Sequence, residues 1–187
     1  MKTYKVEAVV LSRRNLAEAD KLITIFTRQY GKKLVLAKGV RKITSRRAPY
    51  LEPFSHIFLV LHQGRTFDYV SEVTPIASYA LIRDRLFRLS LGMIVLELVE
   101  RLTAENQESQ IIFRQLLNFI NLLNSRDTNR LQVEQTIREF KKFLLIELGF
   151  IRQDSTNNRN FIDQKIAELI QTKLKSSQLL TKIDSQI

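Results

Sequence analysis

The chain has 187 residues, of which 44% are hydrophobic and 26% charged, as in a globular protein with one large domain or two small ones. The formal net charge of +11 indicates a partner that carries phosphates or another anionic surface. The absence of cysteine excludes disulfides, thiol catalysis and thiolate zinc sites.

Five short strands are predicted in the first 75 residues, because β-branched and aromatic residues gather there between turn residues. The strands cover residues 4–13, 21–29, 33–40, 55–62 and 66–73. The first has apolar residues on both faces, as in a barrel strand or a strand covered on both sides. Five such strands close as a small barrel of the OB type or pack as a sandwich, and the pattern does not choose between them.

Turn residues separate these strands. Tyr30 and Gly31 form the turn between the second and third strands, and Gly39 predicts a bulge or a close backbone approach within the third. Residues 41–50 are predicted to form a loop, because Pro49 and a second proline beyond it keep this segment from becoming helix.

The pattern becomes helical after Pro75. Helices are expected from residue 80 onward, near 108–124, near 130–148, after Asn160 as a cap, and after Ser176 or Ser177. Asp127 or Thr128 is expected to cap the third helix and Gly149 to end it. The boundary near residues 75–79 predicts two domains, 1–78 and 79–187. The fold class is α+β, with the strands followed by an α-helical bundle.

The sequence gives little support for an enzyme. His56 and His62 lie about 20 Å apart on one strand, which is too far for a shared metal. Glu18 and Asp20 are interpreted as acceptors of backbone hydrogen bonds in a turn, or as partners of a nearby cation. The five glycines are scattered and form no phosphate-binding loop. We therefore expect no catalytic residues, no metal and no cofactor.

Positive charge is concentrated in the first half, where residues 1–80 hold 14 Lys and Arg (seven of each) against 6 Asp and Glu. One run without acidic residues contains Arg28, Lys32, Lys33, Lys38, Arg41, Lys42, Arg46 and Arg47. Flexible cations in such number are typical of phosphate binding, so these residues are the predicted nucleic-acid site. Arg13, Arg14 and Lys21 are expected to assist.

Single-stranded nucleic acid also needs aromatic side chains on which bases stack. Tyr30 and Tyr50 are the stacking candidates, and for both of them stacking and packing remain open. Phe67 and Tyr69 share one face of the fifth strand, and Phe67 is expected in the core.

Residues 18–42, EADKLITIFTRQYGKKLVLAKGVRK, resemble the RecO family of bacterial DNA repair and recombination-mediator proteins. EAVVLSRRNLAEADK at 7–21, LEPFSHIFLVL at 51–61 and LLIELGF at 144–150 also match the family. Many members carry a four-cysteine zinc module after the last of these segments. Here RQDSTNNRN stands in its place, so those zinc ligands are missing.

The resemblance implies an N-terminal OB-fold, binding of single- and double-stranded DNA, and annealing of complementary strands in the RecF-type recombinational pathway. It also implies RecR as a partner, contact with the acidic C-terminal tail of the single-stranded DNA-binding protein, and indirect help in loading RecA. Arg114 and Lys141, beside apolar helix faces, are the candidates for holding that tail.

The hypothesis is a monomeric, non-enzymatic DNA repair protein. The chain has no apolar run of membrane-spanning length and no apolar signal core, which predicts a cytoplasmic, nucleoid-associated protein without a membrane partner. Two alternatives from other classes stay open: an RNA-binding OB module, and a protein-interaction scaffold built on the helical half.

Overall fold

The computed structural model describes residues 2–16, 18–77, 79–154 and 159–170. The chain forms two compact units, the first of residues 1–78 with 104–113 and the second of 79–103 with 114–187. Residues 104–113 thus belong to the first unit, although they follow a helix of the second in sequence. The division into functional domains at residue 78 stays a prediction.

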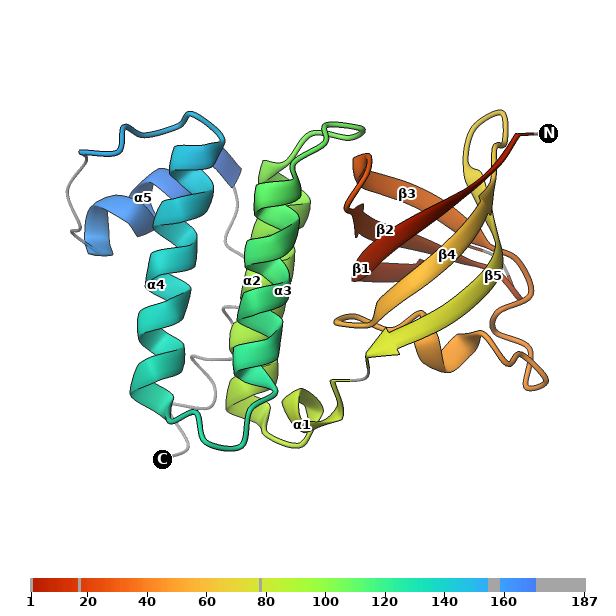
Figure 1. The fold of residues 1–187 in the computed structure, drawn as a ribbon, viewed down its shortest axis with the longest axis horizontal. Helices are drawn as coiled ribbons and strands as arrows, with labels where there is room; N and C mark the ends of the chain where they lie inside the picture. The colour runs from red at the N-terminus through yellow and green to blue at the C-terminus, as the bar shows by residue number, and fades with distance from the viewer. Residues whose placement is uncertain (1, 17, 78, 155–158, 171–187) are drawn as a thin grey trace. The chain divides into compact units, whose positions relative to one another are not determined.

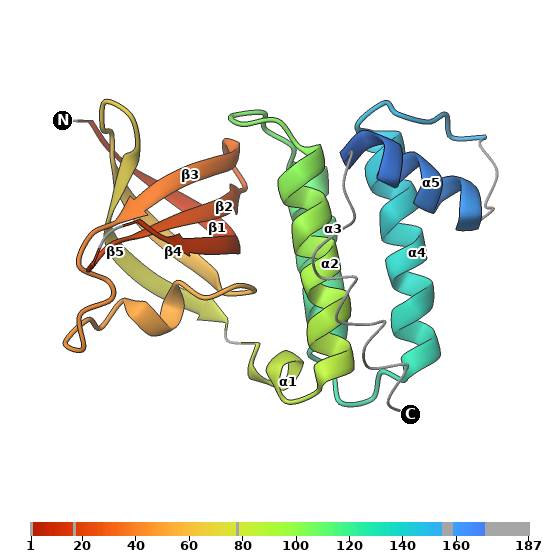
Figure 2. The ribbon, with the colours of Figure 1, turned by 180° about the vertical axis from the view of Figure 1, so that it is seen from behind.

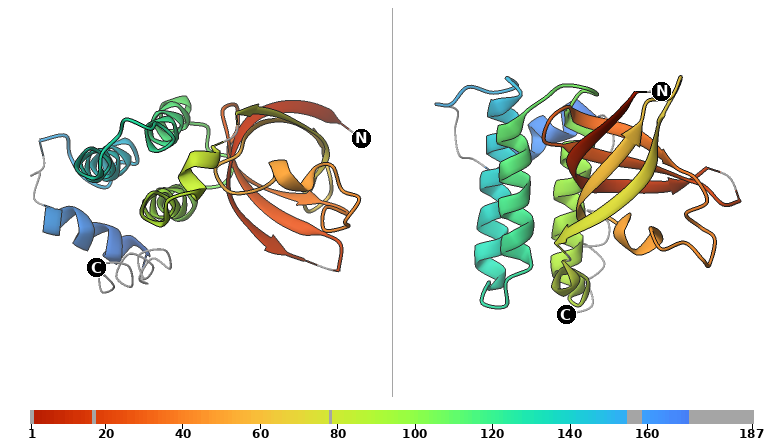
Figure 3. Two further views of the ribbon diagram at one scale, coloured as in Figure 1. Left: turned by 90° about the horizontal axis from the view of Figure 1, so that it is seen from below. Right: turned by 45° about the vertical axis from the view of Figure 1, so that its right-hand side comes forward.

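The first unit contains a closed barrel with the strand order β1-β2-β3-β5-β4 (Figure 1). Its strands are β1 Thr3–Asn15, β2 Lys21–Thr27, β3 Gly31–Ala37, β4 His56–His62 and β5 Asp68–Ala77. The two neighbours β3 and β5 run parallel, and the other neighbouring pairs run antiparallel. Figure 3 shows the strands curving around a common axis. This is the OB-fold barrel, so the sandwich alternative is excluded.

The barrel interior is filled by alternate residues of every strand, because successive side chains of a strand point to opposite faces. The inward residues form one buried cluster that includes Val6, Ala8, Val10, Ile23, Ile25, Val35, Ala37, Ile57, Leu59, Leu61 and Val70. On the opposite face of β1, Val9 and Leu11 are buried too. The prediction that this strand has apolar residues on both faces is confirmed.

The start of β5 differs from the prediction. The strand begins at Asp68, whose carboxylate accepts a hydrogen bond from the Gly64 N–H (3.4 Å) and so closes a longer turn. Val70 points into the barrel and Tyr69 does not. Phe67 precedes the strand and is only half-buried, so its predicted place in the core is wrong.

The segment between β3 and β4 also corrects two predictions. Gly39 lies in a turn with a φ of +66°, beyond the end of β3, so it forms no bulge within the strand. Its N–H donates to the Asp20 carboxylate (2.8 Å), as expected for an acid in a turn. Further on, the short 3-10 helix η1 (Ala48–Tyr50) accommodates Pro49 in its first turn, where a missing N–H costs nothing.

The helices are α1 Ala80–Arg83, α2 Leu86–Leu102, α3 Gln110–Leu123, α4 Arg130–Glu147 and α5 Arg159–Ile170. Figure 2 shows α2 and α4 side by side, and α5 packs against both of them. The central helix α2 is buried on most sides, as its many apolar residues require. Among the described residues, none of the helices is both long and apolar enough for a bilayer.

The predicted helix caps are partly wrong. Asn129 caps α4, because its side chain accepts the Gln132 N–H (2.9 Å) while the Gln132 side chain accepts the Asn129 N–H in return. Neither Asp127 nor Thr128 does so. Asn160 lies within α5 and does not precede it. Gly149, with a φ of +75°, follows the C-cap Leu148 at the end of α4, as predicted. The helix expected after residue 176 lies outside the described residues.

Candidate nucleic-acid interface

The predicted basic residues lie at two ends of the barrel. At one end Lys21 pairs with Asn15 and Ala37, and the segment 38–55 begins there; we call this the loop end. At the other end Thr27 pairs with Gly31 across the β2–β3 turn, and we call this the hairpin end. The strand between them has seven residues, which separates the two ends by about 20 Å. The run of cations in the sequence therefore does not form one continuous surface.

Cations of the hairpin end are held by acidic partners. The Arg28 guanidinium lies 3.2 Å from Oε2 of Glu7, and the His56 ring lies 2.9 Å from Oε1 of the same carboxylate. The Lys33 ammonium lies 3.2 Å from Asp68 and donates to the Asn106 side chain at 3.0 Å. These carboxylates neutralise much of the positive charge that would otherwise attract a phosphate. Lys32 is half-buried at this end, and its carbonyl accepts the Asn106 N–H.

A partly buried network surrounds Lys33. Burial by itself would raise the pKa of Asp68, but hydrogen bonds from Tyr4 and Lys33 and the lysine's charge hold that pKa below its usual value. Burial and the bond to Asp68 raise the pKa of Tyr4. The Tyr30 ring meets the Tyr4 ring edge-on at 5.4 Å. Tyr30 is therefore part of a packed group, although its exposed portion still leaves room for a base.

Five exposed cations of the predicted site lie at the loop end. They are Arg14, Lys38, Arg41, Lys42 and Arg46. The ammonium of Lys38 lies over the Tyr69 ring, 4.4 Å from its centroid. Tyr50, in η1, exposes much of its ring at the same end. Figures 1 and 2 show the β3–β4 segment beyond the strands at this end of the barrel.

Three further predicted cations of the loop end contact a carboxylate or backbone carbonyl oxygens. Arg13 and Lys21 both contact the Glu52 carboxylate, at 2.7 and 3.5 Å. Arg47 donates to the carbonyl oxygens of Val70 (2.7 Å), Ser71 (3.4 Å) and Lys38 (2.7 Å).

The contacts of Arg47 lie beside a weak point of the barrel. The strands β3 and β5 share only two residue pairs, Val35 with Asp68 and Leu36 with Tyr69. The Arg47 guanidinium connects the end of β3 to β5 beyond those pairs. It is a bridge between strands, and its side chain has few donors left for phosphate.

Sequence reasoning missed one residue of the loop end. Ile43 lies between these cations, and its surface is exposed to 105% of the value for a free reference residue. A β-branched apolar residue inside a basic loop was the available signal, since loop tips favour small and polar residues.

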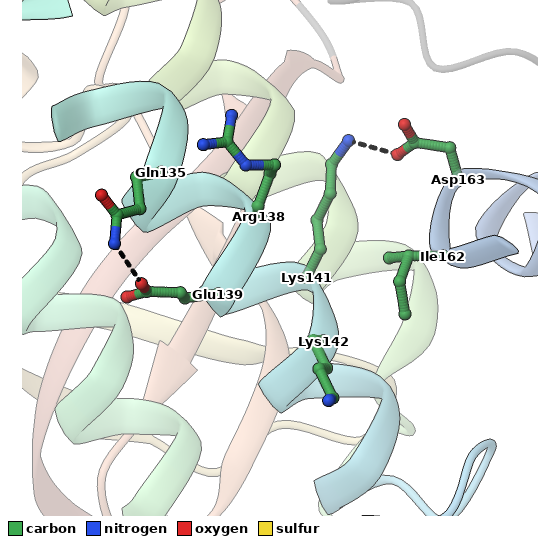
Figure 4. A pocket seen from close by; sticks show the side chains of 7 residues that line it. All are labelled: Gln135, Arg138, Glu139, Lys141, Lys142, Ile162 and Asp163. Atoms are coloured by element: carbon green, nitrogen blue, oxygen red, sulfur yellow. Dashed lines mark hydrogen bonds and ion pairs between the residues drawn. The ribbon is translucent and has the colours of Figure 1, made fainter. Parts of the chain in front are cut away.

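The second unit contains a cavity of about 240 Å³ between α4 and α5 (Figure 4). It is lined by Gln135, Arg138, Glu139, Lys141, Lys142, Ile162 and Asp163. The Lys141 ammonium reaches across it to Asp163 (2.7 Å). Arg114, the other predicted partner residue, is exposed on α3 and does not line this cavity. The described residues also contain no group of three or more His, Cys, Asp or Glu positioned for a metal ion.

The closed five-stranded barrel defines the class of protein to which the first unit belongs, the OB-fold proteins. Comparison with known proteins is more specific. Residues 1–79 match the family model "Recombination protein O N terminal". Residues 1–79 carry the N-terminal domain of the RecO family, and most of the chain is similar to curated proteins named DNA repair protein RecO.

Similarity to curated relatives extends beyond the barrel. The chain is 36% identical over 150 residues to a DNA repair protein RecO of Pelotomaculum thermopropionicum, which covers 80% of this chain and 57% of that protein. It is 34% identical over 149 residues to a DNA repair protein RecO of Roseiflexus sp., covering 80% and 51%. The chain thus spans between half and three-fifths of the length of these relatives.

Proposed function

We propose that this chain is a non-enzymatic DNA-binding protein that anneals complementary strands, with its binding site at the loop end of the barrel. The observation that carries the proposal is the group of exposed cations Arg14, Lys38, Arg41, Lys42 and Arg46. Comparison with relatives named as DNA repair proteins favours DNA over RNA as the ligand. The hairpin-end cations and Arg47 are secondary, because carboxylates and backbone carbonyls already hold them.

Annealing by this surface needs no nucleotide. Two DNA strands repel each other through their phosphates, and cations that contact both strands reduce that repulsion. The free energy then comes from base pairing itself. The barrel contributes a rigid support, because the loop is tied to β5 through Arg47 and to the β1–β2 connection through the Arg41 N–H, which donates to the Ala19 carbonyl (2.9 Å).

A charge-reversal experiment tests the site. The variant carries Arg41→Glu, Lys42→Glu and Arg46→Glu and keeps Arg47, whose loss would disturb the barrel. If about five phosphates are contacted, the native protein loses roughly a hundredfold in single-strand affinity between about 50 and 200 mM salt. Removing three contacts should lower the log–log salt slope by about 2 and slow annealing by at least about tenfold.

The matched control carries Lys2→Glu, Lys5→Glu and Arg65→Glu. These cations are also exposed in the first unit, but they belong to the strand ends near the pair of Thr3 with His62, away from the loop end. The control has the same change in net charge and should keep most of the salt slope. Equal losses in both variants would contradict a site at the loop end. Stronger binding of a matched RNA strand than of DNA would favour the RNA-binding alternative.

The partners of the family are a further part of the proposal. We expect contact with RecR, with the acidic tail of the single-stranded DNA-binding protein, and through them an effect on RecA loading near the nucleoid. The cavity between α4 and α5 suits the acidic tail, because the exposed Arg138 and the half-buried Lys142 stand beside the buried, apolar Ile162. An acidic peptide with an apolar end would find both charge complementarity and an apolar contact there.

Anisotropy with a labelled acidic peptide checks this cavity. Arg138→Glu should weaken peptide binding by about tenfold, because a charge pair is replaced by repulsion. Arg114→Glu, which has the same charge change outside the cavity, should leave binding unchanged, and so should the loop-end triple variant. If Arg114→Glu weakens binding more than Arg138→Glu, the tail binds on α3 and not in the cavity.

A further inference from the structure

The tip of the basic loop is a tight turn with an apolar residue in it. The Ser45 N–H donates to the Lys42 carbonyl (2.9 Å), which makes Ile43 and Thr44 the two central residues. The Ile43 side chain is fully exposed. Exposed cations stand on both sides of it, Arg41 and Lys42 before and Arg46 after.

Folding does not account for this residue. Single exposed apolar side chains are common on protein surfaces, but most bury part of their area against neighbours. Among the described large apolar residues, the next most exposed is Leu131 at 75%. The centre of a turn favours Gly, Asn, Asp or Ser, so isoleucine has no conformational advantage there either.

The loop presents this side chain from a fixed base. On its first side the Lys42 N–H donates to the Gly39 carbonyl (3.2 Å), next to the anchored Arg41. On the other side Arg47 is bound to the barrel carbonyls, and the Tyr50 N–H donates to the Arg47 carbonyl (3.1 Å). Both ends of the tip are thus held, and Ile43 projects between them.

We propose that Ile43 contacts the bases of bound DNA and separates neighbouring bases, while the flanking cations hold the phosphates on either side. This inference rests on the proposed DNA site at the loop end. Apolar side chains are used as wedges between bases in several DNA-binding proteins, where they unstack a step without reading its sequence. Exposed cations recruit a phosphate backbone, and the bases are the apolar part of that same ligand.

The contact also fits annealing. Stacked bases in a single strand must rearrange before they pair with a second strand. A wedge that loosens one step would present the pairing edges of adjacent bases, while the cations reduce repulsion between the strands. Ile43 would act without sequence preference, because an aliphatic side chain makes no directional hydrogen bond to a base.

The test uses the full chain and a single-stranded oligonucleotide containing 2-aminopurine, whose fluorescence rises when it is unstacked. Native protein should raise the fluorescence, and Ile43→Ser should abolish most of that rise. The variant should bind about fivefold more weakly at every salt concentration, as expected for loss of a partly buried isoleucine contact. Its salt slope should match that of the native protein, because the phosphate contacts remain. Ile43→Leu should restore both the fluorescence rise and the affinity.

Controls separate this inference from the proposed function. Leu131→Ser, an exposed apolar residue on α4, should change neither readout. If Ile43→Ser binds and unstacks DNA as the native protein does, the wedge is overturned, while the loop-end site still stands on the lower salt slope of the charge-reversal variant. If the charge-reversal variant binds DNA like the native protein, the loop-end site fails and the wedge fails with it.

Discussion

Replacing Gly31 by alanine is expected to lower the free energy of unfolding by about 3 to 4 kcal/mol, the sum of a left-handed backbone strain and an overpacked contact. Gly31 has a φ of +65°, and a Cβ atom at this position would lie 1.8 Å from the Gln107 carbonyl oxygen. That oxygen is backbone, so the segment 104–113 would have to move. The movement would break the hydrogen bonds that join Asn106 to Lys32 and Lys33. Urea unfolding followed by circular dichroism measures the effect.

Gly39→Ala is the matched control for this prediction. Its φ of +66° is nearly the same, but the nearest atom to a Cβ there is the Lys42 Cδ at 3.9 Å. The control therefore carries the backbone strain without the steric conflict, and we expect a loss of only about 1 kcal/mol. If both alanine variants lose the same stability, the close approach of Gln107 has no energetic weight.

Arg88→Met should destabilise the second unit by about 3 kcal/mol or more, because hydrogen bonds from a charged donor contribute about 1.5 to 3 kcal/mol each and do not add fully. Arg88 on α2 is 5% exposed, and its guanidinium donates to the carbonyls of Leu123 (2.8 Å), Ser125 (2.5 Å) and Thr128 (2.9 Å). The first of these carbonyls belongs to the last residue of α3, where a positive charge also interacts favourably with the helix dipole. Methionine fills the space but leaves three acceptors without this donor.

Two further variants define what Arg88 contributes. Arg88→Lys keeps the charge but not the planar fork, so it should recover only part of the lost stability. Arg101→Met removes an arginine from the same helix that pairs with Glu97 on the surface (3.0 Å), and it should change stability by less than about 0.5 kcal/mol. If Arg88→Met unfolds at the same temperature as the native protein, the result would contradict a role for these hydrogen bonds in stability.

The barrel was predictable because its signal is local. In β4 the alternating residues Ile57, Leu59 and Leu61 lie in the core, as the local pattern of a strand requires, and a glycine after Tyr30 marked the β2–β3 turn. The local pattern did not predict the strand ends correctly where a turn is closed by the side chain of a residue outside that turn. The Asp68 carboxylate moved the start of β5, and the Asp20 carboxylate holds Gly39 outside β3.

The candidate site was less predictable, since charge along a sequence does not report which cations are paired in space. Lys33 and Asp68 are far apart in the chain, and only the register of β3 against β5 brings them together. Arg47 looked like its neighbour Arg46, yet it binds backbone carbonyls, which no composition argument detects. Ile43 differs from its neighbours as an apolar β-branched residue inside a basic loop, but the number of positive charges in that loop does not reveal it.

The contribution of residues 104–113 to the first unit has a consequence for how the protein is made. The Phe113 ring lies 6.1 Å from the His56 ring, and Asn106 binds two residues of β3, so the barrel lacks part of its covering until this segment is available. Translation proceeds at about 5 to 20 residues per second, so residue 113 is synthesised roughly two to seven seconds after residue 78. In that interval its outer surface is open to chaperones and to neighbouring chains. A fragment that ends at residue 78 would remain in this unfinished state permanently.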